Sequence, residues 1–472
     1  MNTWKTGILL GALVLSFNTG CSDDDEPAGT GGASSSGGAA GSAGSGGAAG
    51  SAGSGGAAGS AGSGGAAGSA GSGGAAGSAG SGGAAGSAGS AGSAGAGGQG
   101  GAAGGTGGAS SGPANPTSIA VVTAVSGVAE RLLVAGTDFA TTTEIATVDP
   151  VAKTVLGRAS IADGDAVPAA SGGLGFALER TADQVDVLGA DGSITATIDV
   201  TASPTGSATN QQKAYVTLYG RDHLAVLDLT EHSVQKRVDL SSFAVAGDGD
   251  GSVDADSLVI DRAGNRAYMS LGRIDRSTIT APDYKLACPN AKSLIIALDT
   301  TTDALVGAPI ELELVNPTSV ALDLANARLI VTAAGCYEAG GAARSHAGVE
   351  LVDLTTGATT VRWQPAADDF VSGLLHLGGN RVLLNRFDPS FTEHWTLWDL
   401  TGAGPGDALI GVPTKPAFDG ADGLFGVGSA ASGGGAVPTV VSYALATKAS
   451  DTLVSQPWTS DSLSAAGTAL VR

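Results

Sequence analysis

The sequence predicts an all-β fold, and three observations lead to this prediction. Short segments rich in Val, Ile, Leu and Thr alternate with turns rich in Gly, Asn and Asp, which is typical of β-strands. Residues 316–364 hold four such segments in succession, and the same plan recurs before and after them. One four-stranded antiparallel sheet cannot bury both faces, whereas several sheets packed around an axis can. We therefore expect a seven-bladed β-propeller of four-stranded antiparallel blades.

Residues 1–20 are typical of a secretory signal peptide. Lys5 supplies a positive charge, and 7–17 form an apolar run too short to span a bilayer stably. The end of this segment, Gly20-Cys21, resembles the lipobox of bacterial lipoproteins, although Asn18 stands where that family has an apolar residue. The resemblance implies that Cys21 is lipidated and becomes the mature N-terminus. The alternative is ordinary cleavage nearby, which would leave a free thiol.

Residues 21–27 combine this cysteine with an acidic run, Ser22 to Glu26. Ser after the cysteine is compatible with sorting to the outer membrane, and the acidic run resembles surface-export signals of some lipoproteins. The resemblance implies a protein held on the outer membrane by several acyl chains and exposed at the cell surface. The alternatives are a solvated charge run without sorting meaning, and exposure on the periplasmic side. No other segment is long and apolar enough to cross a membrane, so we expect the body outside the cytoplasm.

A low-complexity linker is predicted for 28–115. Between residues 28 and 112 the chain uses only Gly, Ala, Ser, Thr and one Gln, so it cannot form a core. The nonapeptide Gly-Gly-Ala-Ala-Gly-Ser-Ala-Gly-Ser repeats in tandem from Gly37, and glycine stands at every third position from Gly38 to Gly107. A collagen-like triple helix would need proline in these triplets, and none is present. We expect a disordered, flexible tether, with a helical bundle as the alternative.

The body, 116–472, carries the strand plan seven times. The predicted strands, unit by unit, are 131–135 and 144–149; 174–178, 184–188 and 194–200; 214–218 and 223–228; 257–260, 265–270 and 293–299; 316–323, 328–332, 348–354 and 359–363; 373–377, 381–385 and 394–399; 424–428 and 439–443. A ring removes free sheet edges when its last blade is completed from the other terminus. We expect 462–471 to pair beside 118–139; the alternative is an independent tail.

These units resemble the YVTN family of seven-bladed propellers. Ala214-Tyr215-Val216-Thr217 nearly matches the strand sequence after which the family is named. In several units the third strand ends on an aspartate, at Asp228, Asp299, Asp353 and Asp399. The second unit departs from this pattern, with Leu188-Gly189 there. An aspartate before Thr-Thr or Thr-Gly can accept backbone N–H bonds from the turn that it starts, so we interpret these residues as structural.

The formal charge of −21 argues against a nucleic-acid partner, because phosphate binding needs clustered Lys and Arg. Cys288 and Cys336 lie in equivalent loops of adjacent units, between the second and third strands. An oxidising compartment permits them to pair, so we expect a disulfide; two buried free thiols are the alternative.

The acidic loop 248–256 is a candidate metal site. Its four carboxylates, Asp248, Asp250, Asp254 and Asp256, are the oxygen ligands that Ca²⁺ prefers. The loop lacks the spacing and terminal Glu of an EF-hand, so a solvated acidic loop is the alternative, and no other cofactor is expected.

Catalytic motifs are absent from the sequence, and His346, near Arg344, Tyr337 and Glu338, is the best placed single catalytic candidate. We expect a monomeric, lipid-anchored binding module for a protein, glycan or small ligand. The alternatives are a lactonase- or lyase-like enzyme, since propeller relatives include such enzymes, and a structural surface coat. An enzyme predicts clustered titratable groups with displaced pKa values at the axial mouth, and a binding module predicts an exposed apolar patch there.

Overall fold

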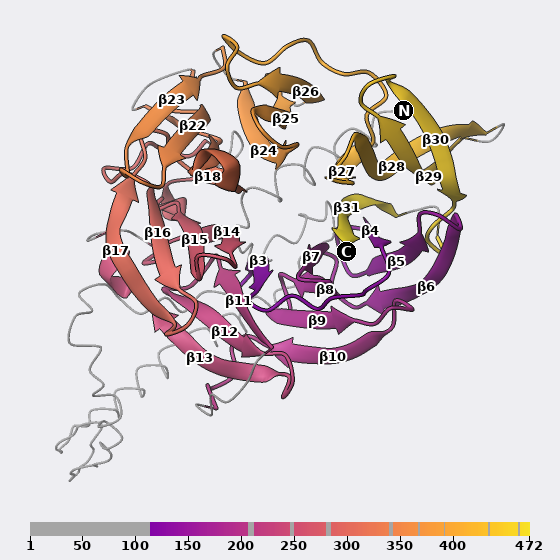
Figure 1. Ribbon diagram of the computed structural model, residues 1–472, viewed down its shortest axis with the longest axis horizontal. Helices are drawn as coiled ribbons and strands as arrows, with labels where there is room; N and C mark the ends of the chain where they lie inside the picture. Colours follow the sequence, from indigo (N-terminus) through magenta and orange to yellow (C-terminus); the bar gives the residue numbers. More distant parts are fainter. Residues whose placement is uncertain are drawn as a thin grey trace, which may run out of the picture. The chain divides into compact units, whose positions relative to one another are not determined.

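The structure, a computed structural model, describes residues 114–205, 212–245, 250–279, 285–338, 343–366, 369–390, 392–432, 435–460 and 463–472. These residues form a ring of seven antiparallel sheets around a central axis, as Figure 1 shows. The predicted fold class, a seven-bladed β-propeller, is confirmed. Residues 1–113, which hold the predicted signal peptide, the predicted lipidation site Cys21 and nearly all of the predicted linker, lie outside the described residues. Ala114 and Asn115, the last two residues of the predicted linker, are buried.

The blades are numbered in the order in which the chain reaches their second strands, and each is given from the axis outward. Blade one is β31 (Ser464–Val471), β4 (Arg131–Thr137), β5 (Thr143–Asp149) and β6 (Thr154–Ile161), and blade two is β7 (Ala166–Ser171), β8 (Leu174–Glu179), β9 (Gln184–Leu188) and β10 (Ile194–Asp199). Blade three is β3 (Pro116–Val121), β11 (Lys213–Leu218), β12 (His223–Asp228) and β13 (Ser233–Asp239), and blade four is β14 (Ala255–Asp261), β15 (Arg266–Leu271), β16 (Leu294–Asp299) and β17 (Ala304–Glu311).

Blade five is β18 (Pro317–Asp323), β19 (Arg328–Ala333), β22 (Gly348–Asp353) and β23 (Thr359–Trp363), and blade seven is β27 (Thr414–Phe418), β28 (Gly423–Ser432), β29 (Gly435–Ala444) and β30 (Ala449–Ser455). Blade six has three regular strands, β24 (Phe370–His376), β25 (Arg381–Phe387) and β26 (Glu393–Asp399), and one isolated bridge from Thr396 to Ala408 stands where a fourth strand would run. A two-stranded ribbon, β20 (Cys336–Tyr337) and β21 (Arg344–Ser345), and three 3₁₀ turns, η3 (Ser241–Phe243), η4 (Arg276–Thr278) and η5 (Leu324–Asn326), complete the described elements.

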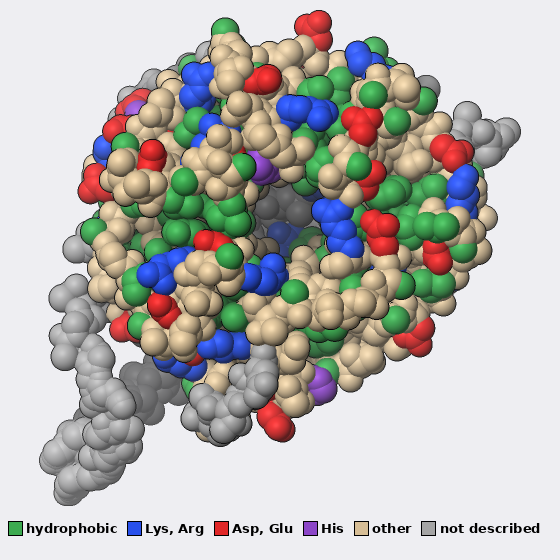
Figure 2. Space-filling view, viewed as in Figure 1, with side chains coloured by type: hydrophobic (Ala, Val, Ile, Leu, Met, Phe, Trp, Pro, Cys, Tyr) green, Lys and Arg blue, Asp and Glu red, His purple; other side chains and the backbone are tan. Residues whose placement is uncertain are grey.

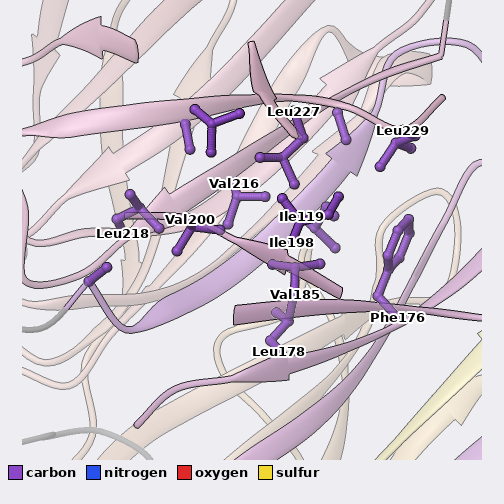
Figure 3. Packing of buried hydrophobic residues seen from close by; sticks show 14 of the residues in the cluster. Ile119, Phe176, Leu178, Val185, Ile198, Val200, Val216, Leu218, Leu227 and Leu229 are labelled. Carbon is purple, nitrogen blue, oxygen red and sulfur yellow. The ribbon is translucent and has the colours of Figure 1, made fainter. Parts of the chain in front are cut away.

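The core consists of one hydrophobic cluster at each of the seven interfaces between neighbouring blades. Successive side chains of a strand point to opposite faces, so each strand contributes to two clusters. Leu132 and Val134 of β4 face blade seven, whereas Leu133 and Ala135 face blade two. Figure 3 shows the cluster between blades two and three, with Phe176 among its buried side chains. Because both faces are covered, the central strands read as continuous apolar runs.

Two blades are completed by segments distant in sequence. The C-terminal strand β31 pairs with β4 and supplies the innermost strand of blade one. This confirms the expectation that 462–471 pair beside 118–139. The N-terminal strand β3 does not join blade one; it pairs with β11 as the innermost strand of blade three. The chain then crosses to blade one, so two non-local pairings hold the ring, where the sequence analysis foresaw one.

The interpretation of the repeated aspartates as structural is confirmed. The first carboxylate oxygen of Asp353 accepts the backbone N–H groups of Thr355 and Thr356 at 2.8 and 2.9 Å. The same two-bond pattern occurs at Asp228 and Asp299, and Asp399 accepts one backbone N–H at 2.9 Å. These aspartates therefore fix the turns between third and fourth strands. Among the described residues, no helix has the length and apolar character needed to cross a membrane.

Candidate functional site at the channel mouth

The candidate site lies where the innermost strands begin, at one end of the central channel. In an up-and-down blade, the start of the first strand, the end of the second and the start of the third share one face, here called the mouth face. Figure 2 shows that the ring is hollow at its centre. On the mouth face, charged side chains of blades two, four, six and seven lie at or next to the ends of strands.

Arg180, directly after β8, is the central charge of this group. Its guanidinium forms an ion pair with Asp165, which directly precedes β7, and its Nε donates to the Asp165 backbone carbonyl at 3.3 Å. Both side chains are largely buried, at 8% and 12% exposure. Burial raises the pKa of Asp165, although the charge of Arg180 opposes that rise. Such a buried pair is costly to desolvate, which favours a role beyond stability.

Asp256, the second residue of β14, faces the same region from blade four. Burial raises its pKa to about 7, although the charge of Arg180 and a hydrogen bond from the Thr117 hydroxyl lower it. The residue as a whole is half-buried. Asp256 therefore changes charge near neutral pH.

Lys415, the second residue of β27, enters from blade seven. Burial lowers its pKa to about 8, with Arg180 lowering it further and the carboxylates of Glu393 and Asp165 opposing. Glu393 is the first residue of β26. Its Oε2 accepts two hydrogen bonds, from Asn385 Nδ2 at 2.5 Å and from Trp395 Nε1 at 2.8 Å. Among the described residues, no hydrogen bond or ion pair is made to Lys415.

Glu179 and Asp186 form a second acidic pair beside the mouth, within blade two. Burial raises the pKa of Glu179 to about 7, and the neighbouring carboxylates of Asp186 and Asp163 add to this rise. Burial also raises the pKa of Asp186, against a hydrogen bond from the Thr197 hydroxyl. Glu179 precedes Arg180 in the chain, so a third group that titrates near neutral pH lies close to the site.

The rim of the mouth is braced across blades four to six. Cys288 and Cys336 form a disulfide with Cα atoms 4.9 Å apart, which joins the two loops in which the sequence analysis placed them. Arg344 lies between two aromatic rings, 4.8 Å from the centroid of Tyr337 and 4.6 Å from that of Phe370. Phe370 is the first residue of β24, so these contacts connect the disulfide-bonded loops to the inner wall of blade six.

The aspartates of the acidic loop 248–256 do not form one metal-binding group in the structure. Asp250 and Asp254 both contact Arg276, at 2.9 and 3.2 Å from its Nε, and Asp254 also accepts the backbone N–H of Ile274. Asp256 makes neither of these ion pairs, and Asp248 lies outside the described residues. Within the described ranges, no three His, Cys, Asp or Glu side chains are grouped as a metal site requires.

His346 lies on the surface of the rim, away from the charged group. Its Nε2 is 3.0 Å from the Glu338 carboxylate, and both side chains are exposed, at 44% and 60%. An exposed histidine with one exposed partner lacks the positioning that general acid–base catalysis requires. The structure therefore brings Asp256 into the candidate site and leaves His346 outside it.

Sequence reasoning missed Arg180, Asp165, Lys415 and Glu393, which come from three blades and share no motif. One signal was present: Asn-Pro-Thr-Ser occurs twice, at 115–118 and 316–319. Both copies begin innermost strands, and in each the Thr hydroxyl bonds a Thr hydroxyl of the next strand, Thr117 to Thr217 at 3.0 Å and Thr318 to Thr332 at 3.1 Å. This repeat could have placed β3 on the axis.

The chemistry open to the site follows from these groups. Arg180 is an always-charged donor, Lys415 is a cation without a described partner, and Asp256 switches between hydrogen-bond donor and acceptor near pH 7. Such a set can bind a small polar ligand, and it also contains an acid and a base with pKa values in the range used for proton transfer.

Comparisons with known proteins find only similarities of low sequence identity. No family model matches the sequence, and no curated protein is similar to it. Similar solved structures include a candidate 6-phosphogluconolactonase from Bacteroides uniformis, at 11% identity and TM-score 0.46, which covers 73% of this chain and 100% of that one. A hypothetical selenium-binding protein from Sulfolobus tokodaii, at 11% identity and TM-score 0.43, covers 72% and 92%.

A third similar structure is the β-propeller domain of Cps50 (Swd1) from Myceliophteria thermophila, at 12% identity and TM-score 0.41, covering 67% of this chain and 94% of that one. Similarity at this level carries no argument about ligand or activity. The assignment of this chain as a seven-bladed β-propeller follows from its own strand pairing.

Proposed function

We propose that this protein is a binding module of the bacterial cell surface, held on the outer membrane by lipid on Cys21, and that it binds a small polar ligand at the channel mouth. The observation that carries the ligand site is the position of three charged residues from different blades at strand ends on the mouth face. Asp256 and Lys415 stand at the start of the innermost strands β14 and β27, and Arg180 follows the end of β8. A ring positions groups from separate blades on rigid strands, which is how a scaffold pre-organises a binding site.

The anchoring part of the proposal is supported by the sequence alone. The signal-like residues 1–20, Cys21 and the acidic run are followed by a tether without core-forming residues. A tether of this composition would let the propeller sample many orientations above a membrane. The YVTN-type units are also part of this proposal, because repeats of this kind suit a displayed binding domain.

The anchor is tested by expressing the full chain and its Cys21→Ser variant in a Gram-negative host. We expect acyl groups on the N-terminal peptide by mass spectrometry, recovery in the outer-membrane fraction, and digestion by protease added to intact cells. The Cys21→Ser variant should lose the acyl mass and the membrane association. Wild-type protein without acyl groups would refute the anchor, and protection from protease would place the propeller on the periplasmic side.

The binding site is tested with small-molecule probes of three charge types: gluconate, ethylamine and glucose. We expect at least one to shift NMR signals of residues around the mouth in the full-length protein. The matched control is Lys448→Gln, because Lys448 is an exposed lysine of the same blade as Lys415 and has a similar φ of 59°. Binding that is lost in Lys415→Gln and kept in Lys448→Gln supports the mouth as the site.

An enzyme is the second candidate function, and the shifted pKa values favour it. Asp256 and Glu179 have pKa values of about 7 and Lys415 of about 8, which suits general acid–base catalysis at neutral pH. Hydrolysis of a simple lactone, followed by pH-stat, tests this function. Turnover that Asp256→Asn abolishes while the fold persists would favour the enzyme over the binding module.

A further inference from the structure

Blade seven lacks a cross-strand pair that the four preceding blades share. In blades three to six the second strand begins with a basic residue, which stands opposite the aspartate that closes the third strand. These pairs are Lys213 with Asp228, Arg266 with Asp299, Arg328 with Asp353 and Arg381 with Asp399. In blade seven the same two positions hold Gly423 and Ala444. A long basic side chain and a carboxylate are therefore replaced by a hydrogen atom and a methyl group.

A pocket of about 290 Å³ lies where these side chains are missing. Its lining residues include Gly423, Phe425, Ser442, Ala444, Asp419 and Asp451. The pocket lies at the end of the blade where the second strand begins, which is the face of the ring opposite the mouth. Phe425 packs in the cluster that blade seven shares with blade one, so the pocket lies on the blade-one side of the sheet.

The pocket distinguishes blade seven from blade two, whose second strand also begins without a basic residue. In blade two the segment after β3 crosses the turn between the first two strands, where the Val125 N–H donates to the Gly172 carbonyl at 2.8 Å. In blade seven the neighbouring blade supplies Lys153, which forms an ion pair with Asp451 at 2.7 Å, and both side chains are exposed. Blade one therefore contributes an ion pair at the rim and leaves the pocket open.

Asp419 is the acidic group that faces the missing basic side chain. In blade five the equivalent aspartate is paired, because Arg328 Nε donates to Asp323 Oδ2 at 2.9 Å. Asp419 stands opposite Gly423 as Asp323 stands opposite Arg328, and its backbone N–H donates to the Gly423 carbonyl at 2.9 Å. Its Oδ1 accepts the N–H groups of Ala421 and Gly423 at 2.7 and 2.9 Å, whereas no described residue donates to its Oδ2. This oxygen lies beside Gly423, since a Cβ added there would overlap with it.

The cations around the pocket have other partners. Lys153 is paired at the rim, and Arg381 lies 3.9 Å from the carboxylate of Asp422. Arg472 donates to the backbone carbonyl of Asp419 rather than to its carboxylate. Within the described ranges the Asp419 carboxylate makes no ion pair, so one negative charge at the pocket has no direct counter-charge.

We infer that this pocket binds the guanidinium group of a ligand, in the place that a basic side chain of the protein itself fills in blades three to six. Asp419 Oδ2 accepts a hydrogen bond from the guanidinium, and the planar cation also contacts the ring of Phe425. A guanidinium is favoured over an ammonium, because three of the four equivalent basic residues are arginines. This site is independent of the one proposed at the mouth.

The test is an NMR titration of the full-length protein with ethylguanidinium, acetate and glucose. We expect only ethylguanidinium to shift the signals of Phe425 and Ser442, with a dissociation constant of about 1–10 mM, because the ligand is small and the pocket is open. Asp419→Asn keeps an oxygen for the two turn N–H groups and removes the charge, so it should weaken binding about tenfold. The matched control is Asp261→Asn, since Asp261 Oδ1 accepts two N–H groups at 3.0 Å in the equivalent turn of blade four. It should bind as wild type.

A second variant, Gly423→Arg, returns the missing side chain to blade seven. Gly423 does not have a positive φ, so an arginine fits its backbone once the Asp419 carboxylate moves aside. We expect this variant to lose ethylguanidinium binding, because its own guanidinium fills the pocket. Circular dichroism and thermal unfolding establish that the variants fold.

A further measurement needs no variant. Raising the NaCl concentration from about 20 mM to about 500 mM should weaken ethylguanidinium binding severalfold, since the partner is a charge in an open pocket. The inference is overturned if ethylguanidinium does not bind, if folded Asp419→Asn binds it as wild type does, or if glucose or acetate binds the pocket in its place. None of these outcomes bears on the site at the mouth.

A last comparison identifies the source of the guanidinium. Free arginine represents a small-molecule ligand, and N-acetylarginine methylamide represents an arginine side chain within a partner protein. Tighter binding of the methylamide assigns the pocket to a protein partner, and tighter binding of free arginine assigns it to a small molecule. Either result supports a guanidinium site, and binding of neither compound contradicts it.

Discussion

Replacing Asp256 by Asn should stabilise the protein at alkaline pH and have little effect in acid. The pKa of Asp256 rises from 3.8 to about 7 on folding, so its ionised form is disfavoured in the native state. Proton linkage gives the sign of the effect on the free energy of unfolding and the pH range in which it changes. Asp256 makes its most favourable contribution to stability below pH 3.8, and this contribution is lost as pH rises to about 7. At about 1.4 kcal/mol for each tenfold change, the full penalty is up to about 4 kcal/mol.

Asparagine has nearly the shape of the protonated acid and cannot ionise, so the Asp256→Asn variant avoids the penalty. We expect it to exceed wild type by less than about 1 kcal/mol at pH 4 and by up to about 4 kcal/mol at pH 8.5. Urea unfolding followed by tryptophan fluorescence at the two pH values measures the difference. Asp407→Asn, at an exposed aspartate of blade six, is the control and should change stability equally at both.

An Asp256→Asn variant that is less stable than wild type at pH 8.5 would refute this prediction. A stability gain of the same size at pH 4 and pH 8.5 would also contradict it, because the effect would then not come from ionisation. If the prediction holds, this carboxyl costs the fold stability at neutral pH. Residues retained at such a cost are expected where they serve binding or catalysis.

Three further predictions concern the frame around the site. Replacing both Cys288 and Cys336 by Ser should lower stability by up to about 4 kcal/mol, since the bond spans 48 residues, and wild type under reducing agent should match it in thermal unfolding. Gly136→Ala should cost about 1–3 kcal/mol in urea unfolding, because its Cβ would fall on the ring of Trp458, whereas Trp458→Ala combined with it should suppress that clash. Tyr215→Phe should cost about 1–2 kcal/mol in the same assay, because it removes a buried hydroxyl's bond to the next blade.

The sequence predicted the second and third strands of the blades well, because both faces of these strands are buried. Continuous runs such as Leu132 to Ala135 follow from that burial and were recognised directly. The innermost strands were harder, since one side faces the channel and polar residues interrupt them, as Lys415 does in β27. Their burial pattern is mixed, and strands were predicted at 257–260, 316–323, 373–377 and 462–471 but none at β3, β7 or β27.

The candidate site could be predicted only in part. Asp256 was singled out for its acidic neighbours, but its position on the axis depends on where β14 begins, which strand boundaries read from sequence do not fix. Arg180 and Lys415 are ordinary single charges in the sequence, 235 positions apart, and only ring closure brings them to one end of the channel. The loops of Cys288 and Cys336 could be placed, because their equivalence follows from strand order within a blade.

The crossing of the N-terminal strand into blade three determines the order in which this protein can assemble. During synthesis β3 is made before the other strands of the ring, yet its partner β11 follows only after blade two has been made. Blade one is completed later still, because its innermost strand, β31, follows all other strands of the ring in the chain. Blades four to seven can form from neighbouring segments as they emerge, but the ring gains its final strand only after blade seven has been made. Pairings this distant slow folding, so the nascent chain must be kept from aggregating until β31 has been made.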